Sequence, residues 1–300
     1  MMFILKTTLE LGILYSFISL ALFISYRILD IADLTTDGSF VLSMAVSVAL
    51  AYHGHPVLGI VLGMLAGGCA GLITAVLQTK FKVPSIIAGI ITSTGLYTIN
   101  LMVMGYASQI SLLKQVTVFG LLRNLGFGGN WYVAIFGLIL LMLVIVLLRM
   151  FLSTRLGLSL RATGDNPAMV TASSINANRM IVIGLVLANM LTGISGALIG
   201  QFNKSADINA GSGIVVVGLA CLIIGESCMH GRRSITRNLL ACFVGNIIYR
   251  LIYAIVLQTQ FVNVQSLRLV TALIVAIAVA MPTIQENYRQ RRMLRKETLC

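Results

Sequence analysis

The sequence is poor in charged residues, and acidic residues are the scarcest of them. Only 10% of the 300 residues are charged, with nine Asp and Glu against 21 Lys and Arg, whereas 58% are hydrophobic. Soluble domains carry about 25% charged residues, so this composition excludes an ordinary soluble protein. The net charge of +12 would suggest nucleic-acid binding in a soluble chain. Here the basic residues gather in particular loops and near the C-terminus, as in membrane proteins, and we expect no nucleic-acid partner.

Catalytic and metal-binding signatures are also missing. The chain contains no H-E-x-x-H, G-x-S-x-G, P-loop or dinucleotide-binding pattern, so we expect neither an enzyme nor a cofactor bound by this chain. The five cysteines are scattered and form no C-x-x-C pair, which argues against a disulfide framework or a zinc site. We interpret His53 and His55 as turn residues and expect no metal site. If nucleotide hydrolysis drives this protein, another subunit must supply it.

Long apolar runs fill most of the chain, and its mean hydropathy is +0.97. One crossing of a bilayer needs about 20 apolar residues. We therefore predict an all-α, polytopic transmembrane bundle of eight to nine spans that forms a single domain over residues 1–300. The segment 34–52 begins with acidic residues and 212–226 is short, so either can be a broken or re-entrant helix. The predicted spans are 9–27, 34–52, 56–79, 84–105, 131–151, 180–202, 212–226, 235–257 and 266–282.

The distribution of basic residues predicts the orientation, because Lys and Arg favour cytoplasmic loops. With all nine segments crossing, the N-terminus lies outside and the C-terminus inside. The longest polar run, residues 153–179, carries Arg155, Arg161 and Arg179 between two spans, which predicts a cytoplasmic segment. The basic tail at about 284–300 is likewise predicted to be cytoplasmic and to lie at the inner leaflet.

A short helix is predicted within this polar run. Asn166 can accept hydrogen bonds from the free amides of a helix start, and Pro167 fits the first helical position because it has no amide to satisfy. The helix would cover roughly 167–175 and expose the small polar side chains of Thr171, Ser173 and Ser174. An isolated helix rich in small residues, held outside the bilayer between two spans, suggests that another protein docks on it.

Polar residues inside the apolar segments are the candidates for a solute path. Asn189, Thr192 and Ser195 lie in the sixth predicted span, with Ser93 and Thr94 in the fourth as weaker candidates. Polar side chains within a bilayer usually face protein or a water-filled path. An equally plain interpretation is that they only form hydrogen bonds to neighbouring helices.

Glycines recur every four residues in the third predicted span. Such a small-xxx-small ladder lets helices approach closely where lipid supplies no hydrophobic drive. It predicts tight packing rather than a function. Its members are Gly59, Gly63, Gly67 and Gly71.

Three of the nine carboxylates lie together between the first two spans, in DIADLTTDGSF. Charges at or within the membrane boundary are costly and usually have a role. Asp30, Asp33 and Asp37 can simply be solvated at the cytoplasmic surface. Alternatively, Asp33 and Asp37 can fix a helix break, by capping the helix that begins near Gly38 or by pairing with Arg27. A direct proton or cation site is the third interpretation, although the spans show no inverted halves with matching charges.

The pattern T-R-x-G-x-x-x-R-A-x-G-x-N-P at 154–167 is followed by Ile175 and Asn176, with GISGALIGQF at 193–202 and GLACLIIGES at 218–227. These motifs resemble the permease subunits of bacterial ATP-binding-cassette importers of the branched-chain amino acid and ribose type. DLTTDGSF further resembles a subgroup linked to aromatic or other amino acids. One departure is Ser174, where the family usually has Gly. The resemblance implies these ATPase-coupling residues: Arg155, Gly157, Arg161, Gly164, Asp165, Asn166, Pro167, Thr171 and Ser174.

The resemblance also implies a multi-pass transport subunit in the bacterial cytoplasmic membrane. Its expected partners are cytoplasmic ATPases that bind ATP and Mg²⁺, an external substrate-binding protein, and a second copy of this chain, since a two-fold pair is the commonest oligomer. The solute would be small, and an amino acid is expected. The alternative is a secondary transporter driven by an ion gradient through Asp30, Asp33 and Asp37. A third hypothesis is a membrane sensor or scaffold whose segment 153–179 contacts a signalling protein.

Overall fold

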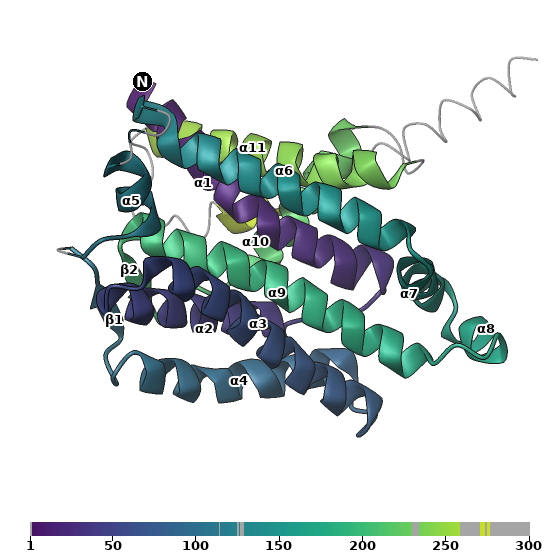
Figure 1. Cartoon of the computed structure of the whole chain (residues 1–300). Coiled ribbons are helices and arrows are strands. Elements are labelled where there is room, and N and C mark those ends of the chain that lie inside the picture. The colour runs from purple at the N-terminus through teal and green to yellow at the C-terminus, as the bar shows by residue number, and fades with distance from the viewer. Residues whose placement is uncertain are drawn as a thin grey trace, which may run out of the picture.

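The computed structural model describes residues 2–258 except 114, 125, 127, 128 and 230–233, together with 271–273, 275 and 276. These residues form a helical bundle with one pair of very short strands (Figure 1). The helices are α1 (Met2–Leu22), η1 (Phe23–Ile28), α2 (Thr35–Tyr52), α3 (Pro56–Thr79), α4 (Ser85–Val103), α5 (Val118–Asn124), η2 (Gly129–Trp131), α6 (Tyr132–Ser153), α7 (Arg155–Asp165), α8 (Pro167–Ala172), α9 (Ala177–Asn203), α10 (Ile214–Cys228) and α11 (Ile235–Gln258). The antiparallel strands are β1 (Gln109–Ser111) and β2 (Ser205–Asp207).

Six of the described helices are long and apolar enough to cross a membrane, and they correspond to six of the nine predicted spans. The predicted second and seventh spans are the helices α2 and α10, of 18 and 15 residues. The predicted ninth span, 266–282, and the basic tail lie outside the described residues apart from five positions. The prediction of an all-α polytopic bundle is thus confirmed. The six helices are Leu5–Ile28, Pro56–Thr79, Ser85–Val103, Gly129–Ser153, Ala177–Asn203 and Ile235–Val256.

Helix α9 lies at the centre of the bundle and packs against α1, α2 and α3 (Figure 1). The glycine ladder of α3 makes the close approach possible, as the spacing predicts. A Cβ added at Gly59 would lie 2.7 Å from the carbonyl oxygen of Ser47, and one at Gly63 would lie 2.8 Å from that of Ser43. Larger residues at these positions would therefore force α3 away from α2.

Two helices begin inside the bundle rather than at its surface. After η1 the chain runs without helix to Thr35, and Asp33 reaches Asn189, twelve residues into α9. With a rise of 1.5 Å per residue, this contact lies about 18 Å from the start of α9. The first residues of α10 contact Asp37 at the start of α2. The starts of α2 and α10, where the sequence predicted broken helices, therefore meet each other, and Asp33, Ile214 and Val215 are buried. Non-helical backbone at membrane depth requires such shielding by protein.

The two ends of the bundle differ in structure. The N-terminal end of α1 lies with α5, β1 and β2 at one end, and α7 with α8 at the other (Figure 1). Lys6 of α1 lies 5.9 Å from the ring centre of Trp131 and 6.0 Å from that of Tyr132, at the start of α6. The N-terminus and the segment 153–179 are therefore on opposite sides, as the predicted orientation requires.

Candidate functional site

The polar segment 153–179 contains two helices, although the sequence predicts only one. Helix α7 begins where the side chain of Thr154 accepts a hydrogen bond from the amide of Gly157, at 3.2 Å. Its buried residues are Gly157, Leu160 and Thr163, a spacing of three that places them on one face. The opposite face carries the exposed Arg155 and Arg161. This helix was not predicted, because its leucines alternate along the sequence and it contains two glycines.

Two glycines that the resemblance marks as coupling residues hold α7 against the bundle. A Cβ at Gly157 would overlap the backbone of Leu152, at the end of α6. A Cβ at Gly164 would overlap the carbonyl oxygen of Ile28, the last residue of η1. Only glycine allows backbones to approach this closely. Helix α7 is therefore attached to the end of α6 and to the η1 end of α1.

Helix α8 starts as the sequence predicts but ends earlier. The side chain of Asn166 accepts a hydrogen bond from the amide of Met169 at 3.1 Å, with Pro167 at the first helical position. The helix ends at Ala172 rather than at 175, because Ser174 adopts a left-handed conformation with φ of 62°. The amide of Ser174 donates to the Thr171 carbonyl and that of Ile175 to the Val170 carbonyl. This bond pattern is the Schellman ending, which usually places glycine at the left-handed position.

The ends of α8 yield a paired prediction. Asn166→Ala is expected to destabilise α8 by about 1 kcal/mol, because it removes the only side-chain cap of the helix start. Ser174→Gly is expected to stabilise it by about 1 kcal/mol, because glycine adopts the left-handed conformation without steric cost. Hydrogen exchange of residues 167–175 measures both changes. Ser173→Gly is the control, since φ of Ser173 is −82°; equal protection in the two glycine variants would contradict the assignment.

The outer surface of α7 and α8 is where a partner can bind. No ion pair of Arg155 or Arg161 occurs within the described part of the chain, so their charges remain available. Met169 is 69% exposed on α8, a large apolar side chain that sequence reasoning did not single out. The signal available was a large apolar residue within the run 153–179 that is predicted to lie outside the bilayer. The predicted coupling residues that are exposed here are Arg155, Arg161, Asp165, Asn166, Pro167, Thr171 and Ser174.

Asp33 forms the break before α2. It is 2% exposed, and its carboxylate accepts hydrogen bonds from the amide of Thr35 at 2.9 Å and from the Asn189 side chain at 2.6 Å. Asn189 in turn accepts a hydrogen bond from the hydroxyl of Ser39 at 2.7 Å. The hydroxyls of Thr35 and Thr74 lie 2.6 Å apart. These hydrogen bonds connect the start of α2 to α3 and α9. They also give each of these buried polar groups a partner.

Asp37 caps a different helix from the one that contains it. Its carboxylate oxygens accept hydrogen bonds from the amides of Gly213 at 3.2 Å and Val215 at 3.0 Å, at the start of α10. A negative charge is favourable at a helix N-terminus. Gly211 permits the approach, because a Cβ there would overlap the Asp37 carbonyl. Gly38 instead brings α2 close to α4, since its Cβ would lie 3.0 Å from Cα of Ser93. Asp37 was expected to cap the helix that begins near Gly38, but that helix, α2, already begins at Thr35, and Asp37 instead bonds the start of α10.

The predicted pairing of Arg27 with the aspartates is wrong. The Nε of Arg27 lies 3.1 Å from a carboxylate oxygen of Glu226, at the end of α10. Asp30 is exposed and has a left-handed backbone with φ of 57°. Within the described residues, no group of three His, Cys, Asp or Glu is placed to hold a metal ion.

Of the predicted path residues, Asn189 and Ser195 bond to neighbouring segments, whereas the hydroxyls of the other three bond within their own helices. Asn189, Thr192 and Ser195 are fully buried. The hydroxyl of Ser195 donates to the Leu14 carbonyl of α1 at 2.8 Å, and that of Thr192 to a carbonyl of its own helix. Ser93 is half-buried and Thr94 exposed on α4, and both donate to the Ile90 carbonyl of the same helix. The bonds of Asn189 and Ser195 fit the plainer interpretation, and a lining role stays a prediction.

The long apolar helices, with α7 and α8 at one end of the bundle, identify the chain as a polytopic membrane protein. The chain belongs to the family of the branched-chain amino acid transport system permease component, which matches residues 4–281. It is therefore a permease of the ATP-binding-cassette importer type, a transport subunit rather than an enzyme, and a multi-pass protein of the bacterial cytoplasmic membrane.

Curated relatives agree with this assignment. A tyrosine transport system permease protein of Clostridioides difficile (strain R20291) is 31% identical over 265 residues, covering 88% of this chain and 86% of that protein. An uncharacterized protein of Rickettsia prowazekii (strain Madrid E) is 31% identical over 282 residues, covering 92% and 97%. A nucleoside ABC transporter permease protein of Lactococcus lactis is 27% identical over 182 residues, covering 57% of each chain. No solved structure matches the chain significantly.

Proposed function

We propose that this chain forms the membrane path of an ATP-driven importer for an amino acid, which an external binding protein delivers. Two copies of the chain and two cytoplasmic ATPases complete the machine, and the ATPases bind the ATP and Mg²⁺. The observation that carries the proposal is the exposed helix pair α7 and α8, which is held to the bundle by glycine contacts. The tyrosine transport permease relative supports an amino acid as the solute.

The contacts of α7 suggest how ATPase closure moves the bundle. Met169 and the small polar residues at the end of α8 (Thr171, Ser173 and Ser174) fit a groove on the ATPase. Arg155 and Arg161 pair with acidic groups there. Motion of α8 passes to α7, and from Gly164 to the η1 end of α1. A second contact runs from α7 to α9, where a Cβ at Gly184 would lie 3.1 Å from the Leu160 side chain. Motion of α7 and α8 thus reaches both α1 and α9. A switch between two discrete packings of the bundle requires such a coupled movement.

The ion-driven alternative finds less support. It needs Asp30, Asp33 and Asp37 to act together on one proton or cation. Their partners differ: Asp33 bonds to Asn189, Asp37 to the start of α10, and Asp30 is exposed. The carboxylates of Asp33 and Asp37 hold helix starts in place, which is sufficient reason for their burial.

Met169→Asp tests the proposal at its central contact. The charge is expected to lower copurification of the ATPase at least about tenfold, because truncating or charging an apolar anchor in a docking surface costs 2 kcal/mol or more. ATP-dependent uptake in proteoliposomes is expected to fall in parallel. Leu113→Asp is the matched control, an apolar residue 81% exposed at the opposite end of the bundle. Uptake driven by an ion gradient without any ATPase would overturn the proposal.

A further inference from the structure

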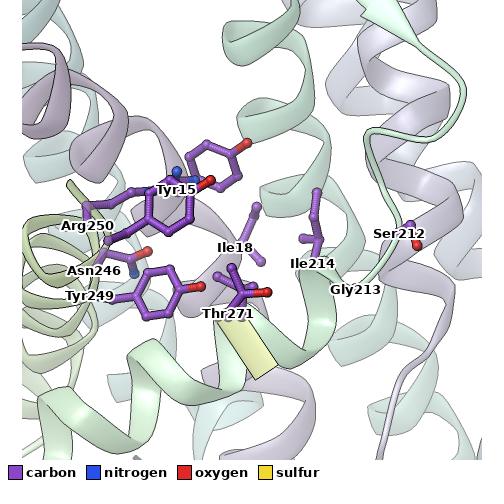
Figure 2. Close-up of a pocket in the computed structure, with 12 residues that line it drawn as sticks. Tyr15, Ile18, Ser212, Gly213, Ile214, Asn246, Tyr249, Arg250 and Thr271 are labelled. Carbon is purple, nitrogen blue, oxygen red and sulfur yellow. The ribbon is translucent and has the colours of Figure 1, made fainter. Parts of the chain in front are cut away.

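A cavity of about 140 Å³ lies between α1, α10 and α11 (Figure 2). Tyr15 and Ile18 of α1 line it, together with residues of α11 on one side and the start of α10 on the other. Its size is close to that of an apolar cavity of about 150 Å³ that takes up a benzene ring. The cavity can therefore hold one aromatic ring, and because it is open on one side, the rest of a larger solute can extend beyond it. Its α11 residues are Asn246, Tyr249, Arg250 and Tyr253.

Arg250 gives this cavity its charge. Its guanidinium carbon lies 3.8 Å from the ring centre of Tyr15, and its Nε is buried without a hydrogen-bond partner. The two ion pairs found among the described residues are Lys6 with Glu10 and Arg27 with Glu226, so neither neutralises it. A charged residue inside a membrane span is costly and normally has a functional partner. The unbonded Nε is a donor that a carboxylate oxygen can satisfy.

The start of α10 does not supply the anion site, although Gly213 and Ile214 line the cavity. The amides of Gly213 and Val215 already donate to Asp37. Arg250 is therefore the group that attracts a negative charge. The Asn246 amide nitrogen donates to Ser19 at 2.6 Å and to the Cys242 carbonyl at 2.9 Å, which leaves its amide oxygen as an acceptor.

We infer that this cavity binds a small aromatic carboxylate, an aromatic α-amino acid in particular, with the carboxylate on Arg250. The solute ring lies among the rings of Tyr15, Tyr249 and Tyr253, and the amide oxygen of Asn246 accepts from its ammonium group. Aromatic rings attract one another in stacked or edge-on contacts, and Arg fits a carboxylate with two parallel donors. This inference rests on the proposed function and names the solute class that the importer carries.

The ligand itself tests the inference without any substitution. The full chain is placed in phosphatidylcholine nanodiscs and titrated with radiolabelled L-tyrosine. Saturable binding is expected. It should be displaced by 3-(4-hydroxyphenyl)propionate, which keeps the carboxylate, and not by tyramine, which lacks it. Equal displacement by the two competitors, or no saturable binding, would overturn the inference. In that case ATP-driven uptake of another solute would still support the proposed function, so the two failures are distinguishable.

Substitutions then locate the site. Arg250→Gln is expected to weaken L-tyrosine binding at least about tenfold, because a hydrogen bond to a charged group contributes about 1.5–3 kcal/mol. Arg250→Lys should retain part of the affinity, since it keeps the charge but loses the two parallel donors. Arg149→Gln, at the end of α6, is the matched control with unchanged binding. Unchanged affinity in Arg250→Gln would contradict the site. So would displacement of L-tyrosine by added phosphatidylglycerol, because Arg250 would then hold a lipid phosphate.

Discussion

Gly164→Ala is expected to lower ATP-driven uptake at least about tenfold while the bundle stays folded. A methyl group at this position would overlap the Ile28 carbonyl oxygen and would lie 3.0 Å from Cα of Leu29. Both are backbone atoms, so α7 must shift as a whole. Overpacking of this kind costs roughly 1–3 kcal/mol, and the shift breaks the contact by which α7 moves the η1 end of α1.

The control is a glycine whose added methyl group meets nothing. Gly95→Ala, on α4, has no atom within 4 Å of the new Cβ, and alanine favours a helix over glycine by about 1 kcal/mol. Uptake by Gly95→Ala should equal that of the wild type. Proteoliposomes containing the ATPase measure uptake, and thermal unfolding measures the stability of each variant. Full uptake by Gly164→Ala at an unchanged unfolding temperature would refute the role of this contact.

The elements that sequence reasoning located depend on local signals. The apolar lengths of α3, α4, α6, α9 and α11 predicted these helices to within a few residues, because bilayer thickness sets the length of a span. Asn166 and Pro167 predicted the start of α8 for a similar reason: a cap and its amide are three residues apart in the chain. The family pattern supplied the other coupling residues, and Gly157 and Gly164 among them lie at backbone contacts.

The features that sequence reasoning missed depend on distant partners. Pairing of Arg27 with a neighbouring aspartate was one of the interpretations left open, yet Arg27 pairs with Glu226, about 200 residues away. Asp37 caps a helix that starts 177 residues further along. Periodicity does not reveal such pairings, because they depend on which helix ends meet in space. The early end of α8 was missed for another reason: Ser174 adopts a conformation that sequence reasoning assigns to glycine.

Asp37→Ala is expected to destabilise the protein by about 3 kcal/mol. The substitution leaves the amides of Gly213 and Val215 without their carboxylate partner inside the bundle, and each unsatisfied buried group costs about 1–3 kcal/mol. The loss should concentrate in α10, whose start has no side-chain cap of its own. Hydrogen exchange of residues 214–228 and thermal unfolding measure the change.

Two further variants separate this structural role from an ion-binding one. Asp37→Asn keeps an acceptor oxygen but loses the charge, so it should lie between the wild type and Asp37→Ala in stability. Asp30→Ala should change little, because Asp30 is exposed. If Asp37 served only to hold helix starts together, transport in these variants would fall in step with protection of α10. Transport abolished in Asp37→Asn, with α10 fully protected and ATP present, would instead indicate a carboxylate that takes up a proton or cation. That outcome would favour the ion-driven secondary transporter over the ATP-driven importer.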